Sequence, residues 1–251
     1  MKQKKHFQKI SLMRPYEIWD LIYRDRGQTR EDEDKLLQYL HNLDRIISSQ
    51  DYREKWFYDN MKRGLDVIGA TSVMAVLLPL MVVVALIIIC SSTGPALYRQ
   101  RRLTSKGRTF LMYKFRTMSA NAEAETGAVW AKDQDPRVTP IGRLLRMTRL
   151  DELPQLINVV IGDMSLVGPR PERPEIADEL LSELPDFDDR HKIRGGVTGL
   201  AQVAYGYASS VSDYKKKLEM DLLYIRHRSF SLDFVIFCRT VFVLIDRHGA
   251  R

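Results

Sequence analysis

The most uneven part of the hydrophobic pattern is residues 67–90, where the sequence VIGATSVMAVLLPLMVVVALIIIC is almost wholly apolar. No charged residue occurs from residue 67 to residue 98. As a helix, this run of 24 residues would be about 36 Å long, against about 30 Å for the hydrocarbon core of a bilayer. A soluble core helix that is so long and so apolar on every side is rare, so the pattern predicts a segment that enters a membrane.

Two features bear on whether this segment crosses the membrane. Pro79 lies near its middle, where a proline removes a backbone hydrogen bond and bends a helix. Both flanks are basic, with Lys62 and Arg63 before the run and Arg99 soon after it, and the positive-inside rule keeps both ends in the cytoplasm. A helix that is bent at Pro79 and enters and leaves by one face satisfies both features, while a simple span stays open as the alternative.

The chain before this segment is charged and helical in pattern. Residues 31–34 are all acidic, and apolar residues follow them at a spacing typical of an amphipathic helix. Three interpretations stay open: the helix packs on the rest of the protein, on a second copy in a homo-oligomer, or on another partner. We predict three regions, namely a helical cytosolic extension over residues 1–60, a membrane-inserted helix over 61–96, and a compact cytosolic domain over 97–251.

The third region mixes short β-like segments with helical ones. Residues 96–98 and 110–115 are β-like. Residues 141–150 predict a helix that carries arginines three positions apart on one face, at Arg143, Arg146 and Arg149. Residues 230–245 are apolar but too short for a span, and predict an interfacial or core helix. The fold class predicted is α+β and mostly helical.

Composition narrows the partners only a little. The net charge is +7 over 251 residues, which indicates an anionic partner: nucleic acid, an anionic membrane surface or a phosphorylated substrate. The two cysteines, Cys90 and Cys238, lie far apart in apolar runs, and the five histidines lack metal-ligand spacing. The pattern therefore excludes a disulfide framework and indicates a reducing compartment.

The first candidate catalytic residues are the adjacent carboxylates Asp151 and Glu152, which follow the arginine-rich segment. Taken alone, two such acids are most simply explained by surface ion pairs. Residues 162–171, GDMSLVGPRP, show no helical period and are interpreted as a loop that presents Arg170 between two prolines. Proline on both sides restricts the backbone, and the planar guanidinium suits a phosphate, although a plain turn stays open as an interpretation.

Several longer motifs carry a family resemblance. The segments Lys114-Phe-Arg-Thr-Met118, Thr148-Arg-Leu-Asp-Glu-Leu-Pro-Gln-Leu-Ile-Asn158 and GDMSLVGPRP are similar to those of the bacterial sugar transferase family, the monotopic polyprenol-phosphate phosphoglycosyl transferases. Residues 192–202, KIRGGVTGLAQ, and 221–224, DLLY, extend the resemblance. It runs from about residue 62 to residue 245 in family order. One departure is Leu78, which precedes Pro79 where members often have serine.

The resemblance implies roles for individual residues. Asp151 corresponds to the family's nucleophile, which attacks the β-phosphorus of a nucleoside diphosphate sugar, and Glu152 corresponds to its dyad partner. Attack by an anion on a diphosphate needs charge neutralisation, which implies Mg²⁺ as cofactor. The implied phosphate-binding residues are Arg146, Arg170 and Lys114, and the implied metal ligands are Asp151, Glu152 and Asp221.

The resemblance also implies an activity and a location. The expected reaction moves a sugar 1-phosphate from a nucleotide sugar, with UDP-hexose as the first expectation, to polyprenol phosphate, and releases UMP. Membrane lipid is an expected partner and nucleic acid is not, since no nucleic-acid reader motif occurs. We expect the re-entrant helix to hold the 97–251 catalytic domain on the cytoplasmic face of the bacterial inner membrane. The remaining alternative class is a catalytically silent scaffold, which would not need Asp151, Glu152 or Arg170.

Overall fold

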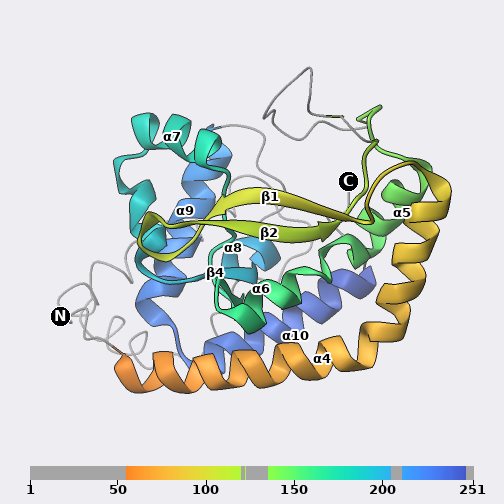
Figure 1. Ribbon diagram of the computed structural model, residues 1–251. Helices are drawn as coiled ribbons and strands as arrows, with labels where there is room; N and C mark the ends of the chain where they lie inside the picture. Colours follow the sequence, from red (N-terminus) through yellow and green to blue (C-terminus); the bar gives the residue numbers. More distant parts are fainter. Residues whose placement is uncertain (1–54, 120–121, 123–134, 205–210, 247–251) are drawn as a thin grey trace, which may run out of the picture.

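The computed structural model describes residues 55–119, 122, 135–204 and 211–246, drawn in colour in Figure 1. The predicted extension over residues 1–60 lies outside this part of the chain, except that its last residues belong to a helix. The elements in chain order are α4 (Trp56–Ser91), β1 (Leu97–Leu103), η1 (Ser105–Gly107), β2 (Thr109–Phe115), α5 (Pro140–Thr148), η2 (Leu150–Glu152), α6 (Gln155–Ile161), β3 (Met164–Val167), α7 (Pro174–Glu183), η3 (Pro185–Lys192), β4 (Gly195–Thr198), α8 (Leu200–Ala204), α9 (Val211–His227) and α10 (Phe230–Asp246).

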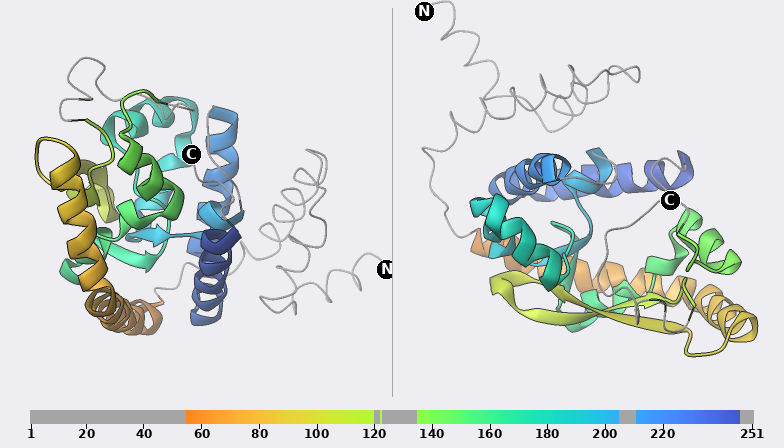
Figure 2. Two further views of the ribbon diagram at one scale, coloured as in Figure 1. Left: turned by 90° about the vertical axis from the view of Figure 1, so that its right-hand side faces the viewer. Right: turned by 90° about the horizontal axis from the view of Figure 1, so that it is seen from above.

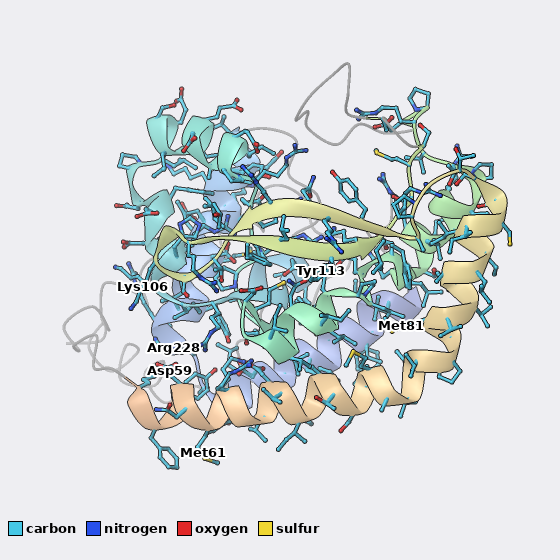
Figure 3. The ribbon with its side chains drawn as sticks, in the orientation of Figure 1. Asp59, Met61, Met81, Lys106, Tyr113 and Arg228 are labelled. Carbon is cyan, nitrogen blue, oxygen red and sulfur yellow. The ribbon has the colours of Figure 1, made fainter. Side chains whose placement is uncertain are left out.

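Helix α4 contains the whole apolar run and is long and apolar enough to cross a membrane. It begins at Trp56, five residues before the predicted boundary at residue 61, and carries Pro79 in its interior. Figure 1 shows it as two arms that meet at a bend. Most of its large apolar side chains are exposed, for example Val76 at 77%, and Met61 points away from the domain (Figure 3). The helix therefore presents an apolar surface with no covering element in the described part of the chain.

The first arm of α4 presents polar side chains to the domain on its opposite face. Lys62 Nζ donates to Asp233 Oδ2 of α10 at 2.7 Å, and Arg63 donates to the carbonyls of Val159 and Val160 at the end of α6. The exposed carboxylate of Asp59 pairs with Arg228, and Figure 3 shows the two facing each other. A cation that binds carbonyls at the carboxyl end of a helix stabilises that end, so Arg63 links α4 to the end of α6.

The end of the second arm is also bound to the domain. Arg116, which follows β2, donates to the carbonyl and hydroxyl oxygens of Ser92 and to the carbonyl of Thr93. Apolar side chains of the same arm, such as Val84 and Ile88, pack with Phe115 of β2. Both ends of the long helix are therefore bound to the same domain.

The strands form two small sheets. β1 and β2 make an antiparallel hairpin that pairs Leu97 with Phe115, and Lys106 and Gly107 take positive φ values in its turn. β3 and β4 pair in parallel, with Met164 opposite Gly195. Figure 2 shows the hairpin and helices α9 and α10 on opposite sides of the molecule. A buried cluster around Tyr224 joins α8, α9 and α10 beneath the parallel pair.

The predicted class, mostly helical with some strands, is confirmed, and so are the β-like segments near residues 96–98 and 110–115. Two local predictions are wrong. Residues 164–167 were expected in a loop but form β3, because they pair with a distant partner, β4. Arg149 does not share a helix face with Arg143 and Arg146, because α5 ends at Thr148 and Arg149 takes a left-handed conformation with φ 57°.

Residues 230–245, expected to be an interfacial or core helix, form α10 with features of both. Ile236 is fully buried in the core cluster around Tyr224. Phe234, Phe237 and Phe242 are exposed. One face of α10 thus completes the core while the other adds apolar surface to the exterior.

Candidate active site

Helix α5 is fixed against the segment that follows β2. Thr139 caps its first turn by accepting a hydrogen bond from the Gly142 amide at 2.9 Å. Gly142 lies so close to the backbone of Thr117 that an added Cβ would be 1.9 Å from the carbonyl oxygen. Only glycine permits this approach, and it brings Arg146 Nε to Thr117 Oγ1 at 3.0 Å.

The acidic pair, Asp151 and Glu152, lies in the short turn between α5 and α6. The turn starts at Arg149, whose left-handed backbone ends α5 and redirects the chain into η2. A non-glycine residue in this conformation is uncommon and carries some strain. The result is that both carboxylates leave the chain within one turn, at the junction of two helices.

Glu152 is clasped by two cations. Arg170 donates from Nη2 to Glu152 Oε1 at 2.6 Å and from Nη1 to Oε2 at 3.2 Å. Lys114 Nζ lies 3.4 Å from the same Oε1. Burial acts to raise the pKa of the Glu152 carboxyl, but Arg170 and Lys114 together outweigh it and hold that pKa well below its usual range. Glu152 is therefore a fixed negative charge at neutral pH.

Asp151 differs sharply from its neighbour. It is buried, and its Oδ1 has no hydrogen-bond partner among the described residues. Burial, reinforced by the charge of Glu152, raises the pKa of the Asp151 carboxyl to about 6, against the opposing effect of Lys114, Arg146 and Arg170. An oxygen in this state is poorly solvated but still ionised at neutral pH, which makes it available as a nucleophile or as a ligand for a cation.

Arg170 is presented by a loop of residues 168–171, here called the Arg170 loop. The Gly168 amide donates to the Thr198 carbonyl at 2.9 Å, and the Gly196 amide donates to the Pro169 carbonyl at 2.8 Å. A Cβ on Gly196 would lie 2.2 Å from the Gly168 nitrogen, so the two backbones require glycine to meet. The ends of β3 and β4 thus anchor the loop that carries the clasping arginine.

Lys114 is the second half-buried cation at the site, beside Arg170. It lies on β2, opposite Tyr98 of β1. Burial lowers the pKa of the Lys114 ammonium to about 8; Glu152 opposes this shift, and Arg170 and Arg102 add to it. At neutral pH the ammonium is mostly charged, so it can contribute positive charge to a phosphate.

The structure brings four of the predicted residues together and sets Asp221 apart. Lys114 and Arg170 contact Glu152, and Asp151 is the adjacent residue. Arg146 is held by Thr117 rather than by a carboxylate, although its charge acts on Asp151. Asp221, on α9, is buried in an ion pair with Arg190 at 2.6 Å. Burial raises the pKa of the Asp221 carboxyl, and Arg190 opposes the shift.

The side chains at the site offer one carboxylate, Asp151, that could hold a magnesium ion. Mg²⁺ usually takes one or two carboxylates, several waters and substrate phosphates. Asp151 Oδ1 has no partner among the described residues, whereas both oxygens of Glu152 accept bonds from cations. No group of three acidic, histidine or cysteine side chains suited to a metal occurs within the described residues. The arrangement fits an ion held by Asp151 and donor phosphates, and not a three-carboxylate cluster.

Sequence reasoning missed two further buried residues near the site. Arg190 reaches the Arg170 loop, but it lies in a charged stretch that carries no motif, and only its burial in the fold marks it. Gln155 is fully buried and neither amide atom has a partner among the described residues. Gln155 lies inside the quoted motif around Asp151, so the signal was present without a role attached.

Comparisons with known proteins agree on one family. Residues 57–247 match the model of the bacterial sugar transferase family. The chain is 42% identical over 194 residues (77% of the chain) to UDP-N-acetylgalactosamine-undecaprenyl-phosphate N-acetylgalactosaminephosphotransferase of Aeromonas hydrophila. It is 41% identical over 194 residues (76% of the chain) to UDP-glucose:undecaprenyl-phosphate glucose-1-phosphate transferase of Caulobacter vibrioides.

A third relative shows that family members differ in length. The chain is 38% identical over 183 residues (72% of the chain) to UDP-glucose:undecaprenyl-phosphate glucose-1-phosphate transferase of Klebsiella pneumoniae. The match spans only 46% of the Aeromonas protein and 39% of the Klebsiella protein, but 72% of the Caulobacter protein. Residues 57–247, which match the family model, contain the hairpin, the acidic pair and the Arg170 loop. The chain belongs to the bacterial sugar transferase family.

Proposed function

We propose that the protein transfers a sugar 1-phosphate from a nucleoside diphosphate sugar to polyprenol phosphate, with undecaprenyl phosphate as the carrier. The relatives are named for this reaction with N-acetylgalactosamine or glucose as the sugar. A UDP-linked hexose or N-acetylhexosamine is accordingly the proposed donor, and UMP the released product. The membrane helix supports a lipid acceptor, because an acceptor with a polyprenyl tail stays in the bilayer.

The proposed mechanism has two displacements. An Asp151 oxygen attacks the β-phosphorus of the donor, the bond from that phosphorus to the bridging oxygen breaks, and the nucleoside monophosphate leaves. The phosphosugar is then held on Asp151 as an acyl phosphate. An oxygen of polyprenol phosphate attacks the same phosphorus and releases the Asp151 carboxylate, which forms the sugar diphospholipid. A carboxylate nucleophile divides one difficult displacement into two easier ones.

The surrounding charges suit this chemistry. Lys114, Arg146 and Arg170 exceed the two acids by one positive charge, so the site favours a diphosphate. Because Arg170 and Lys114 both bind Glu152, we assign Glu152 the role of orienting these two cations. A bound Mg²⁺ would neutralise charge on the diphosphate. Asp151 is the side chain proposed to hold it, together with the donor.

The proposed membrane arrangement is re-entrant, on the cytoplasmic face of the bacterial inner membrane. Pro79 is proposed to cause the bend between the two arms of α4, since proline removes a helical hydrogen bond. The strongest support for the re-entrant arrangement is that both ends of α4 are bound to one domain, through Arg63 at one end and Arg116 at the other. A straight span would place those ends on opposite sides of the bilayer. The arrangement puts the acidic pair near the interface where the acceptor's phosphate lies.

The observation that carries the proposal is the buried, unpaired oxygen of Asp151 beside Glu152, which is clasped by Arg170 and Lys114. The test is isotope exchange without acceptor. Purified enzyme, Mg²⁺, nucleotide sugar and labelled nucleoside monophosphate should return label to the nucleotide sugar, and initial rates should follow a ping-pong pattern. Active protein that shows no exchange without polyprenol phosphate, and intersecting kinetics, would replace the covalent step by direct transfer in a ternary complex.

A further inference from the structure

A second buried charge cluster lies behind the Arg170 loop. Its centre is the ion pair between Arg190 of η3 and Asp221 of α9, at 2.6 Å, and both side chains are buried. The same Arg190 nitrogen that binds Asp221 also donates to the backbone carbonyl of Arg170 at 2.9 Å. The catalytic chemistry proposed above does not use either side chain.

Further contacts bind the residues that follow Arg170 in the chain. Glu172 lies 3.9 Å from Arg190 and 3.4 Å from Arg102 of β1. Arg102 also donates to the carbonyl of Pro171 at 3.1 Å. The buried Arg190 and the half-buried Arg102 thus bind two consecutive carbonyls of the loop, immediately beside the guanidinium that clasps Glu152.

We propose that Arg190 and Asp221 are positioning residues, which hold the Arg170 backbone so that its guanidinium meets Glu152 and the donor diphosphate. This inference rests on the proposed function, because it assigns their work to Arg170 in that reaction. Asp221 orients Arg190 and balances its charge, and Arg190 holds the Arg170 carbonyl. Asp221 acts through two other residues and does not bind the metal ion.

The ion pair between Arg190 and Asp221 adds little stability but contacts the base of the Arg170 side chain. A buried ion pair is a weak source of stability, because desolvation offsets most of the attraction. Displacement of a reacting group by about 1 Å can lower a rate on the order of a hundredfold. The Arg190 contact lies at the base of the Arg170 side chain, where a small backbone shift is carried out to the guanidinium. The pair is thus placed to control geometry more than stability.

The competing role for Asp221 is as a metal ligand. Its Oδ2 is engaged by Arg190 at 2.6 Å, and within the described residues it forms no cluster with other metal-binding side chains. The positive charge of Arg190 beside this carboxylate disfavours a cation at the same group. The two roles make different predictions for Mg²⁺ dependence.

The test is a double-mutant cycle with four proteins: wild type, Asp221→Asn, Arg170→Ala and the double variant. Release of nucleoside monophosphate from a donor that wild type accepts gives kcat and KM, and a magnesium titration gives the half-saturating concentration. We expect Asp221→Asn to lower kcat about tenfold to a hundredfold in wild type and less than about twofold in Arg170→Ala. The half-saturating Mg²⁺ concentration should not change.

Two results would overturn the positioning role. Equal losses on both backgrounds would make Asp221 a structural residue, and a large rise in the Mg²⁺ requirement would make it a metal ligand. Asp66→Asn is the matched control, since Asp66 is a buried aspartate that binds Ser165 and does not contact the Arg170 loop. Its effect should be equal on both backgrounds.

A second variant covers the case in which Asp221→Asn does not fold. Arg190→Met combined with Asp221→Leu replaces the ion pair by apolar side chains of similar volume, which buried pairs often tolerate. It should show the same loss of kcat that disappears on the Arg170→Ala background, and an equal loss on both would again overturn the proposal.

Failure of the proposed function would be visible first in the wild type, as no release from any nucleotide sugar. In that case the same proteins are compared by calorimetric binding of inorganic pyrophosphate, which we expect to depend on Arg170 and which requires no sugar. Weaker binding that depends on Arg170 would support positioning, and equal weakening on both backgrounds would oppose it.

Discussion

Asp66 and Asp151 are two aspartates buried to nearly the same degree, with 5% and 7% of their surface exposed. The oxygens of Asp66 are fully engaged: Oδ2 accepts from the Ser165 hydroxyl at 2.7 Å, and Oδ1 accepts from the Leu166 amide and from Lys62. Asp151 Oδ1 has no such partner in the described part of the chain. The same side chain at the same depth is thus satisfied in one region and left unsatisfied in the other.

The difference separates a structural from a reactive carboxylate. A buried polar group without a hydrogen bond costs about 1–3 kcal/mol, and more when it is charged. The protein avoids this cost at Asp66, where α4 joins β3, and accepts it at Asp151. The Asp151 carboxylate destabilises the protein without substrate, and a bond to phosphorus or to a cation would remove that cost. Such a group is typical of a reactive site.

The largest effect should come from Asp151→Asn. The amide keeps the size of the side chain but loses the charge and the nucleophilicity, so acceptor-free exchange should fall at least about a thousandfold, or roughly 4 kcal/mol. Asp66→Asn in the same assay, normalised to folded protein, should stay within about threefold of wild type. Retention of exchange by Asp151→Asn would place the nucleophile elsewhere and dissolve the contrast.

Arg170→Lys should have the next largest effect on turnover. Lysine keeps the charge but cannot make the two-pronged contact with Glu152 that the guanidinium makes. We expect a loss of about tenfold to a thousandfold in kcat, or roughly 1.4–4 kcal/mol. The matched control is Arg108→Lys, an exposed arginine that pairs with Asp163. Turnover within twofold of wild type would make the Arg170 loop a structural turn.

The two aspartates should respond to the same substitution with opposite changes in stability. Because its pKa is raised to about 6, ionised Asp151 destabilises the native state. Asp151→Asn should therefore stabilise the protein by roughly 2–3 kcal/mol above pH 6, and the gain should fade between pH 6 and pH 4 as the wild-type carboxyl is protonated. Asp66→Asn should destabilise by about 1–3 kcal/mol.

Thermal melting in detergent micelles, without Mg²⁺ or donor, measures both effects across this pH range. Below about pH 4, the unfolded pKa of aspartate, the carboxyl is protonated in both the native and the unfolded state, so the Asp151 gain must be absent there. A gain of equal size at pH 4 and pH 8 would show that its cause is packing and not charge.

Much of the fold could be predicted from the sequence, because the strongest sequence patterns depend on residues close in the chain. The apolar run around Pro79 and the alternation in the hairpin each depend on residues close in the chain. β3 was missed because four residues give no clear period, and their partner β4 begins 28 residues after β3 ends. The end of α5 was missed because Arg149 takes a conformation that sequence patterns assign to glycine or asparagine.

The residues of the candidate site also fall into two groups, those that a local motif identifies and those that only the fold brings together. Asp151 and Glu152 lie in one motif, and Arg170 lies between two prolines, so local sequence was enough to single them out. Arg190 and Asp221 come from separate elements and meet only in the fold, 31 positions apart. A motif could mark Asp221 as notable, but only the contact with Arg190 indicates what it does.

The smallest change in stability is expected at Gln155, where the comparison between paired and unpaired side chains extends from carboxylates to amides. Gln155 and Asn158 are both fully buried in α6. Asn158 accepts from the Tyr113 amide at 2.9 Å and donates to the Leu111 carbonyl at 2.8 Å, which joins α6 to β2. Gln155 has no partner at either amide atom among the described residues. The pair repeats, three residues apart, the contrast between Asp66 and Asp151.

Gln155→Met should stabilise the protein by about 1 kcal/mol, since a thioether of similar volume removes the unpaired polar atoms. Asn158→Leu should destabilise by about 2–4 kcal/mol, because it leaves an amide and a carbonyl of β2 unpaired. Thermal melting of both variants beside wild type measures the difference. A loss of more than about 1 kcal/mol in Gln155→Met would mean that a buried water satisfies the amide, and the contrast would then hold for the carboxylates alone. Stabilisation together with loss of exchange activity would instead place Gln155 with Asp151, as a group whose partner is the substrate.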